Sequence, residues 1–163
     1  MILAVDPGTL QSGWCLFANN HVKGYGVSQN PDMLTIIRDT SATVLAIERV
    51  ASYGMSVGRE VFETCEWVGD FRNEWRRLGK GEAVLVYRKD VKLHLCGSSR
   101  AKDSNVRQAL IDLFEPTGGG KCRQIGVKGK PGPLFGVSSH AWPALGVAVT
   151  ATASPGRGFA ARA

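Results

Sequence analysis

Acidic residues are missing from the C-terminal part of this 163-residue chain, because none follows Glu115. A site that needs carboxylates must therefore take them from earlier segments. The same absence makes the charge uneven, since the net charge is +6 and the C-terminal part contains only basic charged residues. Those cations are Lys121, Arg123, Lys128, Lys130, Arg157 and Arg162.

Cysteine is sparse and is not spaced as in zinc sites. The cysteines are Cys15, Cys65, Cys96 and Cys122. They form no CxxC pair, and three of them lie within apolar patterns, so we expect reduced cysteines and no zinc centre.

Long hydrophobic runs are absent, and no segment approaches the length that spans a bilayer. With 44% hydrophobic and 21% charged residues, the composition is that of a soluble globular chain. The apolar segment before Asp6 is too short for a signal peptide and lacks basic residues, so we expect a cytoplasmic protein. We also expect one domain over residues 1–153 and a disordered tail over 154–163.

Two predicted buried strands each end in an acidic residue. Residues 2–5 are apolar and mostly branched, and Asp6 follows them directly before a Pro7-Gly8 turn. Residues 43–47 run in the same way into Glu48. An ionised carboxylate is costly to bury without a cation or hydrogen-bond donors, so the pair indicates a metal ion. The alternative is that Asp6 only bonds the backbone of its own turn.

The remaining pattern predicts a mixed α/β order. Strands are predicted near 2–5, 13–17, 21–27, 43–47 and 83–87, and helices near 31–39, 57–78, 102–114 and 139–150. Residues 115–137 contain too much Gly and Pro for a regular element. A loop of this length is usually functional or disordered, and its cations favour a function.

The basic residues point to a polyanionic partner. Besides the C-terminal cations, an earlier basic stretch contains Arg88, Lys89, Lys92, Arg100, Lys102 and Arg107. Nucleic acid is the usual partner of a small basic domain, although such a surface also serves solubility or an anionic protein partner.

Taken together, the motifs resemble a known family. They are VDPGT followed by GW, the strand end Ile47-Glu48, a basic helix, and His140 shortly before Ala144-Leu145. The chain resembles RuvC-type Holliday junction resolvases over about residues 1–151. Three segments are most similar to bacteriophage versions: GMSVGREVFET, VKLHLCGSSRAKDSNVRQALID and KPGPLFGVSSHAWPALGVAVTA. The resemblance implies an RNase H-like fold, a mixed five-stranded sheet flanked by helices, and for a phage protein the cytoplasm of the bacterial host.

The resemblance also implies a reaction. Members of the family act as homodimers that cut four-way DNA junctions with divalent metal, Mg²⁺ or Mn²⁺, held by acidic residues. Asp6 and Glu48 match two of those positions. Relatives place an Asp, or a His and then an Asp three residues later, in the first turn of the last helix. Here His140 matches the first position, but Pro143 stands where the final Asp belongs.

Two routes to a complete site stay open. In one, His140 joins Asp6 and Glu48 as a metal ligand or general base, and DNA phosphate and water complete the metal shells. In the other, Asp103 is recruited, although an acid in the first turn of a helix is already favoured by the helix dipole.

DNA contacts are assigned by charge and by the same resemblance. Lys102 is expected near the reacting phosphate, where it could neutralise developing charge. Tyr53 could stack on an unpaired base at the junction centre or pack in the core. The phosphate contacts are expected from Arg88, Lys89, Lys92, Arg100, Lys102, Arg107, Lys121, Arg123, Lys128 and Lys130.

Two other classes of protein compete with a nuclease. The sugar kinase, actin and Hsp70 superfamily also begins with an acidic hairpin, but it needs about twice this length. A junction-binding protein that has lost catalysis, with Pro143 as the lesion, is the more serious alternative. Metal-dependent nicking of DNA distinguishes it from an active nuclease.

Overall fold

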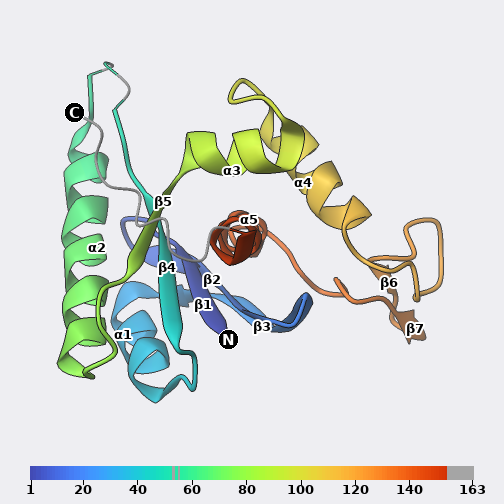
Figure 1. Cartoon of the computed structure of the whole chain (residues 1–163), viewed down its shortest axis with the longest axis horizontal. Helices are drawn as coiled ribbons and strands as arrows, with labels where there is room; N and C mark the ends of the chain where they lie inside the picture. The colour runs from blue at the N-terminus through green and yellow to red at the C-terminus, as the bar shows by residue number, and fades with distance from the viewer. Residues whose placement is uncertain (53, 55, 154–163) are drawn as a thin grey trace.

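A mixed five-stranded sheet forms the centre of the computed structural model, which describes residues 1–52, 54 and 56–153 (Figure 1). The strands are β1 (Ile2–Asp6), β2 (Gln11–Ala18), β3 (His21–Gln29), β4 (Val44–Arg49) and β5 (Val84–Tyr87). Their order is β3-β2-β1-β4-β5, with β1 to β3 antiparallel and with β4 and β5 parallel to β1. All five predicted strands are confirmed.

Within the described residues, five α-helices flank this sheet. They are α1 (Asn30–Asp39), α2 (Arg59–Arg77), α3 (Arg88–Cys96), α4 (Asp103–Asp112) and α5 (Ala141–Ala153). α1 and α2 cover one face of the sheet, and α5 lies against the other face beside α3 and α4 (Figure 1). The predicted fold class is therefore confirmed. No described helix is both long and apolar enough to cross a membrane.

Alternation along the central strands divides the core in two. In β1, Leu3 and Val5 pack with α1 and α2, whereas Ala4 lies on the α5 side, as does Ala46 of β4. Successive side chains of a strand point to opposite faces, so this sequence pattern sets the two layers. The small alanines leave room for α5, which is apolar almost all round because it is buried between the sheet and two helices.

The sequence does not predict helix α3. No loop precedes this helix, since β5 ends at Tyr87 and α3 begins at Arg88. Only Val91 of its nine residues is fully buried. The apolar residues of this segment therefore show little helical periodicity in the sequence. The helix ends at Gly97, whose φ of 68° is in the left-handed region that suits glycine.

Residues 115–137 are mostly irregular, as predicted, but they carry a small hairpin. Its strands are β6 (Gly126–Val127) and β7 (Lys130–Pro131), which lie at the right of Figure 1, away from the sheet. Leu134 anchors the segment, because it is fully buried in the core on the α5 side. The predicted tail over 154–163 lies outside the described residues.

Candidate functional site

The two strand-end acids meet at one edge of the sheet. β1 and β4 are parallel neighbours, and Val5 of β1 is the register partner of Ile47 of β4. The next residues along the two strands are Asp6 and Glu48, so the same register brings their carboxylates side by side. Each side chain is only 16% exposed. The structure thus brings together the first two predicted site residues.

His140 reaches this edge from the other end of the chain. Its Nδ1 lies 3.3 Å from Oδ2 of Asp6. Gly13, the strand partner of Asp6, permits this approach, because any side chain there would overlap the His140 backbone. The preceding residue, Ser139, has a φ of 45°, which is uncommon for a residue other than glycine. His140 therefore lies in a strained turn just before α5, not in the first helical turn predicted from the sequence.

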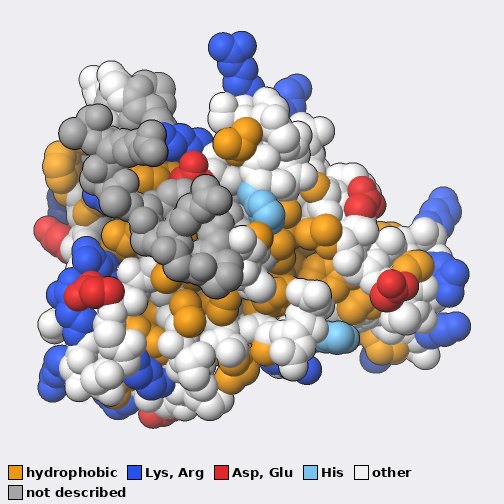
Figure 2. Space-filling view, viewed as in Figure 1, with side chains coloured by type: hydrophobic (Ala, Val, Ile, Leu, Met, Phe, Trp, Pro, Cys, Tyr) orange, Lys and Arg blue, Asp and Glu red, His pale blue; other side chains and the backbone are white. Residues whose placement is uncertain are grey.

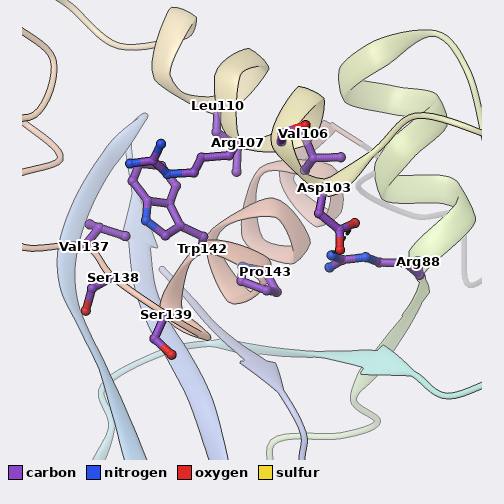
Figure 3. Close-up of a pocket in the computed structure, with 11 residues that line it drawn as sticks. Arg88, Asp103, Val106, Arg107, Leu110, Val137, Ser138, Ser139, Trp142 and Pro143 are labelled. Atoms are coloured by element: carbon purple, nitrogen blue, oxygen red, sulfur yellow. Dashed lines mark ion pairs between the residues drawn. The ribbon is translucent and has the colours of Figure 1, made fainter. Parts of the chain in front are cut away.

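Arg88 links Glu48 to α4. One guanidinium nitrogen, Nη1, lies 3.2 Å from Oε2 of Glu48, and the other, Nη2, lies 2.9 Å from Oδ1 of Asp103. Lys92 approaches the same Asp103 oxygen at 3.5 Å. Figure 3 shows Arg88 and Asp103 pointing toward each other. Asp103 therefore lies at the edge of the site, where it is connected to Glu48 only indirectly, through the Arg88 side chain. The sequence predicts only a phosphate contact for Arg88 and misses its ion pairs.

The electrostatics of the two acids reflect crowding of negative charge in a buried place. Burial, and then the charge of Asp6, raises the pKa of Glu48 to about 7, although Arg88 acts in the opposite direction. Burial also raises the pKa of Asp6, against the influence of His140. At Asp103, burial is outweighed by Arg88 and Lys92, so the pKa of that carboxyl is lowered. The positive charge of His140 and Arg88 therefore does not offset the burial of Asp6 and Glu48, and the pKa values of both carboxyls stay raised.

This donor set fits a divalent cation only in part. Two partly buried carboxylates whose pKa values are raised by burial are the oxygen donors that Mg²⁺ and Mn²⁺ prefer, and His140 adds a nitrogen donor. Among the described residues, however, no group of three or more His, Cys, Asp or Glu side chains is arranged as a metal site. Arg88 is bound to Glu48, and Pro143 supplies no carboxylate. Asp6, Glu48 and His140 could hold a metal once other oxygens complete its shell.

The remaining predicted residues surround this edge or lie farther away. Lys102 immediately precedes α4 and is exposed next to Asp103. The cations of residues 115–137 are exposed around the β6–β7 hairpin, and Figure 2 shows Lys and Arg side chains there. Tyr53 lies outside the described residues. The other exposed cations of the predicted set are Lys89, Arg100 and Arg107.

The raised pKa of Glu48 predicts a stability that depends on pH. The Glu48 carboxyl has a pKa of about 7 in the folded protein, compared with its ordinary value of 4.5. Such a group stabilises the folded state most while it is protonated. Its contribution is complete below pH 4.5 and is lost as the pH rises toward 7. At roughly 1.4 kcal/mol per pKa unit, the loss is about 3 kcal/mol.

Urea denaturation of the metal-free protein, carried out in chelator, measures this effect. We expect the free energy of unfolding to fall between about pH 5 and pH 8, and to fall less in the Glu48→Gln variant. The difference between the two proteins isolates Glu48 from other titrating groups. Parallel pH profiles would show that Glu48 does not titrate in this range.

Comparisons with known proteins place the fold. The sequence matches no protein-family model and no curated protein. The structure is similar to Thermus thermophilus RuvC, with a TM-score of 0.61 and 15% sequence identity. It is also similar to T. thermophilus RuvC in complex with a Holliday junction substrate, with a TM-score of 0.64 and 16% identity. Each comparison covers 93% of this chain and 92% of the other. This chain therefore has the fold of RuvC.

Proposed function

We propose that this chain is a structure-selective endonuclease that resolves four-way or other branched DNA junctions by metal-dependent phosphodiester hydrolysis. The observation that carries the proposal is the meeting of Asp6 and Glu48 at the ends of β1 and β4, with His140 against Asp6. The RuvC fold supports it, since one of the similar structures is bound to a Holliday junction substrate.

The chain's own residues have distinct roles in this proposal. Asp6 and Glu48 would hold Mg²⁺ or Mn²⁺, and His140 would complete the ligand set or accept a proton from water. When bound, such cations supply an activated water and stabilise charge on the leaving oxygen. Lys102, exposed at the start of α4, would contact the phosphate being cleaved. Arg88 would leave Glu48 for a phosphate oxygen as DNA and metal arrive.

The proposal extends to assembly and origin. A four-way junction has two opposed strands to cut, and each chain has one pair of strand-end acids, so a homodimer is the expected working form. The single domain over 1–153 would carry the whole site. The bacteriophage origin rests on the sequence resemblance, and with it the cytoplasm of a bacterial host as the place of action.

Incubation with labelled DNA tests the proposal directly. A synthetic four-way junction and a linear duplex of the same arm sequence would each receive the protein with magnesium, manganese or chelator. We expect paired nicks in the junction with either metal, and none in the duplex or in chelator. Equal cutting of the duplex would contradict structure selectivity.

A junction-binding protein without catalysis is the second candidate. Two observations favour it: the Arg88 guanidinium lies on Glu48, and Pro143 takes the place of a carboxylate. Such a protein would bind the junction with unchanged affinity in chelator and would leave it intact at every metal concentration. The same experiment therefore separates the two functions.

Junction binding is expected to depend steeply on salt. The exposed cations of the basic stretch and of the β6–β7 hairpin suit phosphate contacts, which release counterions from DNA. With several such contacts, affinity should fall roughly tenfold or more across a few-fold rise in salt concentration. Fluorescence anisotropy in chelator measures this without cleavage. A salt-independent affinity would exclude a binding mode dominated by phosphate.

A further inference from the structure

A cavity of about 550 Å³ adjoins the acidic site. It lies between α4, the beginning of α5 and residues 137–139 (Figure 3). Its size is within the range of roughly 300–1,000 Å³ that is usual for small-ligand sites. The apolar part of its lining comes from Val106, Leu110, Val137, Trp142 and Pro143.

A planar cation lies over an aromatic ring at this cavity. The guanidinium carbon of Arg107 is 4.7 Å from the centre of the Trp142 ring, and Figure 3 shows the two groups stacked. Trp142 is 8% exposed, whereas Arg107 is exposed and lines the cavity. Arginine planes and aromatic rings are the surfaces on which proteins stack unpaired bases. Arg107 on Trp142 therefore offers a flat, charged platform.

The cavity adjoins the proposed cleavage site through Arg88. Arg88 and Asp103 line it, and the same Arg88 side chain bonds Glu48. A group in the cavity would therefore be close to a phosphate bound through a metal ion at Asp6 and Glu48. Ser138 and Ser139 also line the cavity and offer hydroxyl groups, so the cavity combines apolar walls, a stacking platform and hydrogen-bonding groups. A nucleobase has two apolar faces and a polar edge, which matches this lining.

We propose that the cavity receives one unpaired nucleobase from the strand being cut, at a nucleotide adjacent to the cleaved phosphate, and stacks it on Arg107 and Trp142. The inference rests on the proposed function and adds a selectivity element to it. A base in a continuous duplex must leave its stack to enter, whereas bases at a junction centre are already free to do so. The cavity would thus favour cutting at the branch point.

Photocrosslinking tests the location. Junctions carrying 5-iodouracil at single positions around the cleaved phosphate would be irradiated with the protein in chelator, and the crosslinked residue identified by mass spectrometry. We expect one position to crosslink to Trp142. Crosslinks that never involve a residue of this cavity would overturn the proposal, whatever the protein does to the junction.

A substitution cycle tests the stacking. We expect removal of that one base, leaving an abasic site, to weaken junction affinity about tenfold, as loss of one stacked base does. Arg107→Lys keeps the charge but loses the plane, so it should weaken affinity for the intact junction similarly and show little further loss on the abasic junction. Arg59→Lys, the matched control on an exposed arginine of α2 outside the predicted DNA contacts, should retain the full dependence on the base.

The outcomes separate this inference from the proposed function. If the wild type and Arg107→Lys lose equal affinity at the abasic site, the cavity does not stack the base, while junction resolution stands. If the wild type binds the junction no better than a duplex, the proposed function and the inference both fail.

Discussion

Asp6→Asn and Glu48→Gln are each expected to reduce the rate of junction cleavage by at least about a thousandfold, equivalent to about 4 kcal/mol. Either change removes one of the two carboxylates that meet at the ends of β1 and β4. Junction affinity in chelator should stay the same or rise slightly, because a negative charge has been removed near the DNA backbone. Single-turnover cleavage with excess protein, together with anisotropy, measures the two effects separately.

Glu115→Gln is the matched control for these variants. Glu115 is exposed beyond α4 and forms no ion pair with Arg88, Lys92 or His140. The same loss of charge there should leave cleavage unchanged. If Asp6→Asn or Glu48→Gln cleaves junctions at the wild-type rate, the carboxylate pair is not the catalytic site.

His140→Ala should reduce turnover by about a hundredfold or more, as expected for the loss of a general base or a metal ligand. The imidazole is the closest polar partner of Asp6, and its side chain is 56% exposed, so its removal should not disturb folding. Circular dichroism and thermal unfolding would check this, and cleavage would be measured under single-turnover conditions. His94→Ala, an exposed histidine of α3, is the control.

Two further variants distinguish the role of His140 from that of a packing residue. His140→Asp keeps an oxygen donor at this position and should retain part of the activity. Pro143→Asp places a carboxylate where the resemblance to RuvC-type resolvases implies one, and it should maintain or increase the rate, because the first turn of a helix does not require proline. Wild-type cleavage by His140→Ala would contradict the assignment and make Asp103 the next residue to substitute.

The sheet and its acidic edge could be predicted from the sequence, because each strand and the acid that follows it form a short local pattern. Short continuous apolar runs in residues 2–5 and 43–47 predict two buried strands. Asp6 and Glu48 directly follow these runs, so both acids are predicted at strand ends. Helix α3 was missed because a nine-residue helix with one fully buried side chain leaves little periodicity to detect.

The sequence by itself determined the five strands, the two acids at their ends and the absence of any carboxylate beyond Glu115. Only the tertiary structure decided that His140 meets Asp6, that Arg88 joins Glu48 to Asp103, and that a cavity opens beside them. These contacts join residues far apart in the chain, through the close approach of the His140 backbone to Gly13 and the packing of α4 on α3 and α5. The local periodicity of a sequence indicates which face of a helix or strand is buried, but it does not indicate which distant side chains pack against that face.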